Sequence, residues 1–134
     1  MTDQARNGTV VGVIGLGNAG YAVASAFAKL SPVHGYDLNG DKRTSASQGG
    51  IITHDQFGAF TAAIDVAILS LPHPDISLAV TGQLLDLESR PKLIIDTSTV
   101  TPQTAIDCAS LTSPCGVGFV DAAIAGGVAS MANG

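Results

Sequence analysis

The chain has 134 residues, of which 46% are hydrophobic and only 13% charged, and its mean hydropathy is +0.35. Its net charge of −5 and isoelectric point near 4.7 argue against a general basic field for phosphate backbones, so we expect no nucleic-acid partner. The even, apolar texture is typical of one domain built on a parallel sheet that is covered on both faces.

The start of the chain and its cysteines suggest where the protein works. Residues 1–8 are polar, and we predict a short tail there, followed by one domain over residues 9–134. No signal-peptide pattern opens the chain, and no stretch reaches the roughly 18 apolar residues of a membrane span. Cys108 and Cys115 stand outside any metal-ligand motif. We therefore expect a cytoplasmic protein with reduced thiols, no bound metal and no membrane contact.

Apolar runs and helical spacings alternate along the chain, separated by glycines and prolines. The predicted strands are residues 9–14, 33–36, 51–53, 64–71, 92–95 and 117–120. The predicted helices are residues 18–30, 41–48, 55–60, 74–87 and 102–111, with Asp55 as the cap of the third. This alternation predicts an α/β fold with a doubly wound parallel sheet of the Rossmann type, which binds ligands at the carboxyl ends of its strands.

A glycine-rich turn links the first predicted strand to the first predicted helix and reads Gly15-Leu16-Gly17-Asn18-Ala19-Gly20. In a dinucleotide-binding turn, the three glycines allow a tight bend, close approach of phosphates to the backbone, and close helix packing. Asp37 ends the next strand 20 positions after Gly17, where such a site places a ribose-binding acid. Two other interpretations stay open: glycine-rich turns also join ordinary elements, and Asp37 could instead cap the following turn.

Three further segments lie at predicted strand ends. They are Leu71-Pro72, Asp96-Thr97-Ser98-Thr99 and the segment from Asp121 to Gly127, which ends in Gly126-Gly127. Together with the glycine turn, they make residues 10–134 resemble the cofactor-binding half of the β-hydroxyacid dehydrogenases. This family includes 3-hydroxyisobutyrate dehydrogenase, tartronate semialdehyde reductase and 6-phosphogluconate dehydrogenase.

The resemblance implies a set of binding residues. The pyrophosphate would lie on the glycine turn, the adenine ribose on Asp37, and the nicotinamide ribose near Thr99. The residues implied to bind the cofactor are Gly15, Leu16, Gly17, Asn18, Ala19, Gly20, Asp37, Leu38, Asn39, Leu71, Pro72, Ile76 and Thr99. The residues implied to hold the substrate carboxylate, through backbone N–H groups, are Ala125, Gly126 and Gly127.

The chain departs from the family pattern in two ways. Ala123 and Ala125 replace a proline and a serine, which removes a stiff residue and a hydroxyl from the predicted substrate loop. The resemblance implies that the family's catalytic lysine and its helical, dimer-forming domain lie beyond Gly134. Neither Lys29, Lys42 nor Lys92 lies in a matching motif. The catalytic residue is therefore unknown. We expect the longer form to be a homo-oligomer.

The predicted cofactor is NAD rather than NADP. The Asp37 carboxylate would repel a 2′-phosphate, and Leu38 stands where NADP-dependent relatives tend to carry arginine. Lys42 and Arg43 follow closely and could offset that repulsion.

Other polar residues admit structural roles. His73 lies between two prolines at a strand end and could reach the cofactor, but a turn residue is the simpler interpretation. Ser98 or Thr99 could cap the helix that begins near Pro102. The histidines and cysteines form no metal-binding pattern.

The resemblance thus implies the cofactor domain of an oxidoreductase that transfers hydride between NAD and a small β-hydroxyacid. We expect little or no turnover from these residues alone, because the resemblance places the acid–base lysine elsewhere. The alternative is a stand-alone dinucleotide-binding sensor or interaction module without catalysis.

Overall fold

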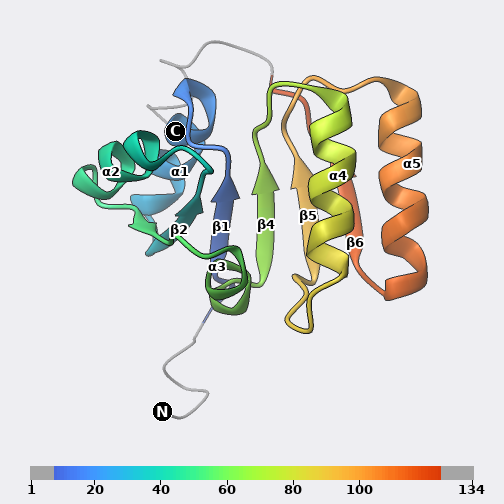
Figure 1. The fold of residues 1–134 in the computed structure, drawn as a ribbon, viewed down its shortest axis with the longest axis horizontal. Coiled ribbons are helices and arrows are strands. Elements are labelled where there is room, and N and C mark those ends of the chain that lie inside the picture. Colours follow the sequence, from blue (N-terminus) through green and yellow to red (C-terminus); the bar gives the residue numbers. More distant parts are fainter. Residues whose placement is uncertain (1–7, 125–134) are drawn as a thin grey trace.

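Short runs rich in Val, Ile and Leu form a parallel sheet in the computed structural model, which describes residues 8–124 (Figure 1). The strands are β1 (Val11–Ile14), β2 (Val33–Tyr36), β3 (Ile52–Thr53), β4 (Val66–Leu69), β5 (Leu93–Asp96) and β6 (Gly118–Asp121). Their order across the sheet is β3-β2-β1-β4-β5-β6, and every pairing is parallel. The predicted doubly wound Rossmann-type sheet is confirmed, with its switch point between β1 and β4.

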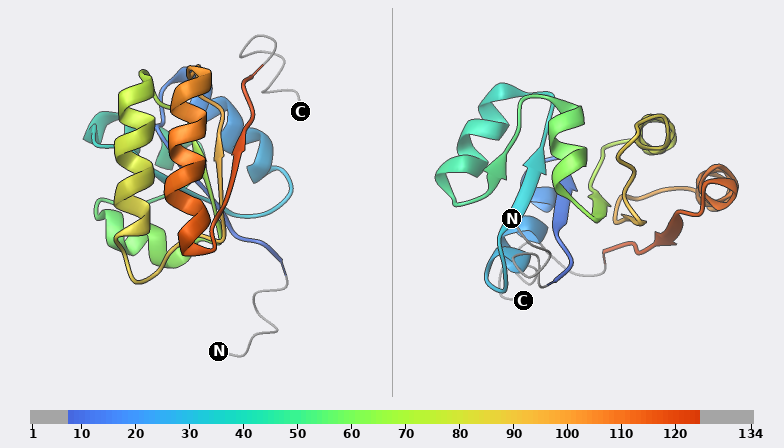
Figure 2. Two further views of the ribbon diagram at one scale, coloured as in Figure 1. Left: turned by 90° about the vertical axis from the view of Figure 1, so that its right-hand side faces the viewer. Right: turned by 90° about the horizontal axis from the view of Figure 1, so that it is seen from below.

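Helices cover both faces of this sheet. They are α1 (Asn18–Ala28), α2 (Gly40–Gln48), α3 (Phe57–Ala63), α4 (Pro74–Leu85) and α5 (Pro102–Thr112), followed by the 3-10 turn η2 (Ser113–Cys115). Figure 2 shows α4 and α5 on one side of the sheet and α1 on the other. The connections between parallel strands run through these helices, so the carboxyl ends of β1, β2, β4 and β5 meet at one edge.

Each face of the sheet has its own hydrophobic core. The core under α3, α4 and α5 contains Ile14, Phe60, Ile64, Ala67, Leu69, Leu84, Leu85, Ile94 and Val117. The core under α1 and α2 contains Val13, Leu16, Val23, Ala24, Val33, Ala46, Ile51 and Ile68. Adjacent residues of β1 and β4 alternate between the two cores, which holds the centre of the sheet rigid beneath its carboxyl edge.

Several predicted boundaries are wrong by a few residues. The strand predicted over 64–71 is four residues shorter in the structure, since Ile64 is the C-cap that follows α3 and Ser70 belongs to the loop after β4. Residues 87 and 30 fall outside α4 and α1, which end at Leu85 and Ala28. Asp55 does not cap α3, because Gln56 occupies the cap position and α3 begins at Phe57. Apolar side chains continue past the end of regular pairing, so periodicity alone overextends an element.

Candidate cofactor site

The glycine turn is held by backbone geometry that only glycine tolerates. Gly15 has φ of +96°, and a Cβ there would collide with the carbonyl oxygen of Ser70. A Cβ on Gly20 would collide with the Gly15 carbonyl oxygen. A Cβ on Gly17 would meet only the Nζ of Lys42, at 3.9 Å. The first and third glycines therefore serve the fold, whereas the second leaves open space beside the backbone.

That open space lies at the beginning of α1. Gly17 is the N-cap of the helix, it has no capping side chain, and the first turn holds no acidic residue. The first N–H groups of a helix lack partners within the helix and carry its positive dipole end. This helix end is therefore suited to an anion such as a pyrophosphate.

Asp37 joins the end of β2 to the glycine turn. Its Oδ2 accepts a hydrogen bond from the Leu16 backbone N–H at 2.8 Å, and its Oδ1 accepts one from the Asn39 N–H, also at 2.8 Å. The half-buried carboxylate is thus fixed in position by two backbone donors. Since each carboxylate oxygen can accept a further bond, Asp37 can still receive ribose hydroxyls.

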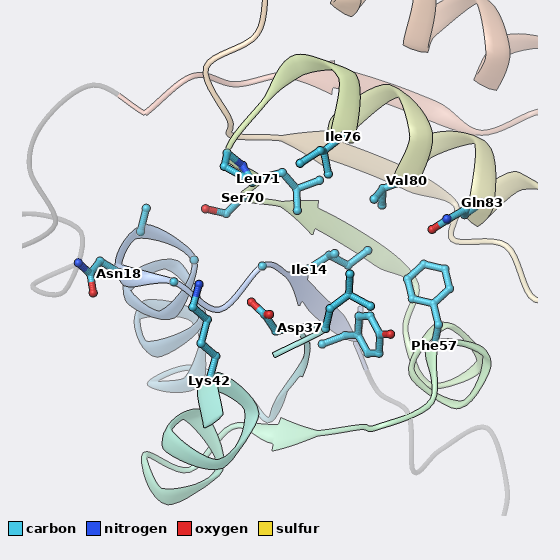
Figure 3. Close-up of a pocket in the computed structure, with 17 residues that line it drawn as sticks. Ile14, Asn18, Asp37, Lys42, Phe57, Ser70, Leu71, Ile76, Val80 and Gln83 are labelled. Atoms are coloured by element: carbon cyan, nitrogen blue, oxygen red, sulfur yellow. The ribbon is translucent and has the colours of Figure 1, made fainter. Parts of the chain in front are cut away.

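Two basic side chains of α2 have different tasks. The guanidinium of Arg43 donates to the backbone carbonyls of Asp37 and Leu38, at 2.8 and 3.2 Å, and so braces the β2–α2 loop. Lys42 instead extends toward the glycine turn and lines the pocket described next (Figure 3). Asn39 caps α2 by accepting from the N–H groups of Asp41 and Lys42.

A pocket of about 770 Å³ lies at this carboxyl edge of the sheet (Figure 3). Its lining combines Ile14, Gly15, Gly17, Asn18, Ala19, Gly20, Tyr36, Asp37, Leu38, Lys42, Phe57, Ser70, Leu71, Pro72, Ile76, Val80 and Gln83. Figure 3 shows Asn18 and Lys42 at one end, Asp37 near the middle, and Phe57 and Gln83 at the other end. The pocket therefore joins an anion-binding end to an apolar end, with a carboxylate between them.

Hydrogen bonds from the segment after β5 fix the loop after β4, which lines the pocket. Leu71 donates its backbone N–H to the Ser98 hydroxyl at 2.8 Å, and Thr97 donates its hydroxyl to the Leu69 carbonyl at 2.7 Å. The Ser98 N–H in turn donates to Oδ1 of the fully buried Asp96 at 2.9 Å. The Asp-Thr-Ser segment therefore positions the loop after β4 that borders the pocket.

Comparison with known proteins gives the family. The sequence pattern of the NAD binding domain of 6-phosphogluconate dehydrogenase matches residues 10–134. The chain belongs to this family. No curated protein sequence matches significantly.

Solved structures of related domains agree with this assignment. A 3-hydroxyisobutyrate dehydrogenase from Mycobacterium tuberculosis, solved with L-serine, has 27% identity and a TM-score of 0.86 over 93% of this chain and 43% of its own. Psf3 in complex with NADP+ and 2-OPP has 26% identity and a TM-score of 0.79 over 92% of this chain and 45% of its own. An imine reductase variant from Myxococcus stipitatus in complex with NAD+, at 16% identity, shares the fold over 84% of this chain and 39% of its own, with a TM-score of 0.74.

This NAD-binding domain thus corresponds to the kind found in 3-hydroxyisobutyrate dehydrogenase-like oxidoreductases, as the strand-end motifs predicted. The chain spans less than half the length of each of these three proteins. The predicted resemblance to the β-hydroxyacid dehydrogenases is confirmed.

Most of the predicted cofactor residues lie together in the NAD-binding domain. Ten of them line the large pocket: Gly15, Gly17, Asn18, Ala19, Gly20, Asp37, Leu38, Leu71, Pro72 and Ile76. Leu16 and Asn39 border a neighbouring pocket, and Thr99 is exposed and lines neither. Ala125, Gly126 and Gly127 lie outside the described residues. The binding roles of all these residues, for cofactor and for substrate, stay predictions.

Sequence reasoning missed part of the lining. Ser70 and Tyr36 directly adjoin predicted residues. Val80 and Gln83 lie four and seven positions after Ile76 on α4, so helical spacing could have found them. Phe57 carried no signal, because α3 reaches the pocket only through the tertiary fold.

Among residues 8–124, no group of three or more His, Cys, Asp or Glu side chains is arranged to hold a metal ion.

His34 and His54 share one hydrogen bond of 2.8 Å between ring nitrogens, and burial together with nearby His54 lowers the pKa of His34. Burial raises the pKa of the Cys108 thiol. His73 is exposed at the cap of α4, which fits a turn residue. Over the described range, no helix is long and apolar enough to span a membrane.

Proposed function

We propose that the large pocket binds the adenosine diphosphate half of NAD and that the chain is the cofactor domain of an oxidoreductase acting on a small β-hydroxyacid. One observation carries the proposal: a single pocket joins the open face of Gly17 to the Asp37 carboxylate and to the apolar side chains of α4. That order of anion site, hydroxyl acceptor and apolar slot fits a pyrophosphate, a ribose and a base.

The chain's own residues bind and orient the cofactor, and NAD when bound supplies the hydride acceptor. Backbone N–H groups at the start of α1 receive the pyrophosphate without a formal positive charge. Asp37 receives the ribose hydroxyls because its carboxylate is already held by the Leu16 and Asn39 amides. No rearrangement of that carboxylate is needed on binding.

NAD is the proposed cofactor in preference to NADP. The fixed Asp37 carboxylate would repel a 2′-phosphate at the ribose, and the neighbouring Leu38 offers no cation. Nη1 of Arg43 donates to two backbone carbonyls, which holds the guanidinium on the loop and directs that nitrogen away from a 2′-phosphate. Lys42 does face the pocket, and we expect it to keep some NADP affinity rather than to reverse the preference.

A small β-hydroxyacid is the proposed substrate class of the whole enzyme. The Mycobacterium tuberculosis relative was solved with L-serine, which is itself a small β-hydroxy acid. The predicted carboxylate-binding residues Ala125, Gly126 and Gly127 support the same class through their sequence motif.

The acid–base group of the reaction is proposed to come from outside this site. Lys29 follows the end of α1, and Lys92 precedes β5 at the amino edge of the sheet. Lys42 lies on the pyrophosphate side of the pocket. None of these three lysines of the described residues lies at the carboxyl ends of β4 and β5, where we expect the nicotinamide. We therefore expect cofactor binding with little or no turnover.

Calorimetric titration with NAD and NADP at one fixed salt concentration tests the proposal. We expect NAD to bind with a lower Kd than NADP. A lower Kd for NADP would overturn the cofactor preference. If neither nucleotide gives a heat of binding, the proposed binding function is wrong. Appreciable oxidation of 3-hydroxyisobutyrate, glycerate or threonate by this chain would contradict the expected lack of turnover.

A further inference from the structure

The apolar end of the pocket has a regular construction. Ile76, Val80 and Gln83 lie on one stripe of α4, and Figure 3 shows all three directed into the pocket. At 1.5 Å per residue the stripe is about 10 Å long, so the pocket continues well along the helix. Phe57 of α3 lies at the same end, and its ring packs against that of Tyr36 with 5.1 Å between the ring centroids. We call this region, defined by Phe57, Ile76, Val80 and Gln83, the helix end of the pocket.

The helix end suits a flat, mostly apolar group. Aromatic and aliphatic side chains from two helices supply opposing walls, which favours stacking on a planar ring. A purine base attached to a ribose on Asp37 would enter between these walls, since Asp37 lies between the glycine turn and the helix end (Figure 3).

Gln83 supplies the polar group at this end. It is the only side-chain carboxamide in the part of the lining that α4 contributes, and it is exposed to the pocket opening. Its carboxamide has no hydrogen-bond partner among residues 8–124. A carboxamide offers one acceptor and two donor hydrogens, so it can pair with two neighbouring atoms of a base edge.

We propose that Gln83 determines base specificity by pairing with the amino-bearing edge of the adenine ring, which lies in the helix end. This inference rests on the proposed function. The Gln83 Oε1 accepts from the 6-amino group of adenine, while the Nε2 donates to a neighbouring ring nitrogen. A base without the 6-amino group loses one of these bonds and leaves the carboxamide oxygen without its donor.

A thermodynamic cycle tests this pairing in the full 134-residue chain. The two ligands are NAD and its purine analogue, nicotinamide purine dinucleotide, which differs only by the missing 6-amino group. The two proteins are the wild type and Gln83→Leu. We expect the wild type to bind NAD about tenfold more tightly than the purine analogue, and we expect Gln83→Leu to remove most of that preference.

A matched control makes the same chemical change elsewhere. Gln103→Leu lies on α5, where Gln103 bonds to Asp107 at the surface away from the pocket, and it should leave both affinities unchanged. Thermal melting of Gln83→Leu checks that the exposed substitution leaves the fold intact.

The outcomes separate the two proposals. Equal weakening of both ligands by Gln83→Leu, or no change in NAD affinity, overturns base reading while NAD binding stands. If the wild type binds neither dinucleotide, the proposed function fails and base reading fails with it.

Discussion

The two ends of the cofactor pocket are built in different ways. The loop end, residues 15–20, presents backbone groups from one continuous segment, and its shape depends on glycines at Gly15 and Gly20. The helix end presents side chains from α3 and α4, which are separate in sequence and meet only when the sheet has formed. Asp37 lies between the two ends and is bonded to the loop.

Because of this difference, the two ends tolerate different amino-acid substitutions. A backbone site is insensitive to the chemistry of its side chains but fails when a Cβ enters the wrong place. A side-chain site tolerates small backbone shifts but changes its ligand preference when one functional group is replaced. We expect substitutions at the loop end to act on folding and on all dinucleotides, and substitutions at the helix end to act on discrimination between them.

The largest effect is expected from Gly15→Val. A β-branched residue at φ of +96° is strained, and its Cβ would collide with the backbone of Ser70. We expect the free energy of unfolding to fall by at least about 2 kcal/mol, with loss of dinucleotide binding. Urea denaturation measures the change.

A helical glycine with room around it serves as the control for Gly15. Gly82→Ala on α4 meets nothing within 4 Å and should be neutral or stabilising. Wild-type stability in Gly15→Val would show that the turn can adopt another conformation.

Gly17→Ala separates binding from folding at the same end. The added methyl meets only the Lys42 Nζ, at 3.9 Å, so the free protein should lose less than about 1 kcal/mol of stability. It would occupy the space that phosphates need, so we expect the Kd for NAD to rise more than about tenfold. Titration calorimetry and thermal melting of one preparation give both quantities. Unchanged affinity would place the pyrophosphate elsewhere.

Asp37→Asn tests the point where the two ends meet. Loss of the carboxylate removes a charged hydrogen-bond acceptor for the ribose, and we expect about tenfold weaker NAD binding. The same change removes the repulsion toward a 2′-phosphate, so the ratio of NADP to NAD affinity should rise. Asp107→Asn, which makes the same charge change on α5 outside the pocket lining, is the control. A ratio that stays constant would show that Asp37 serves only to hold the Leu16 amide.

The same contrast explains what the sequence could predict. The doubly wound sheet, the glycine turn and the position of Asp37 at a strand end were predicted because alternating apolar segments and a continuous motif encode them locally. Both ends of β4 were misplaced because Ile64 and Leu71 are apolar yet lie outside the strand. The loop that contains Leu71 is held by the Ser98 hydroxyl. Phe57 was missed because its place beside α4 depends on packing of the whole sheet, which no short pattern carries.

The smallest effect concerns a histidine pair behind the helix end. The His54 ring lies 6.0 Å from that of Phe60, which neighbours the Phe57 ring at 6.2 Å, and a 2.8 Å bond links His54 to His34. Burial and His54 hold the pKa of His34 below its usual 6.5. Below that pH the unfolded chain therefore binds a proton that the folded chain resists, so stability present above pH 6.5 is lost as the pH falls.

Thermal melting between pH 7.5 and pH 5.5 should show this loss as a decrease of a few degrees, about what a partly exposed pair can contribute. His34→Asn should flatten the dependence, because it removes the group whose protonation the fold opposes. Exposed His73→Gln should leave the dependence as it is in the wild type. An equal slope in wild type and His34→Asn would mean that other groups set the acid sensitivity. A smaller slope in His34→Asn would instead assign the acid sensitivity to the side chains packed behind the helix end. The loop end contains no titratable side chain of its own.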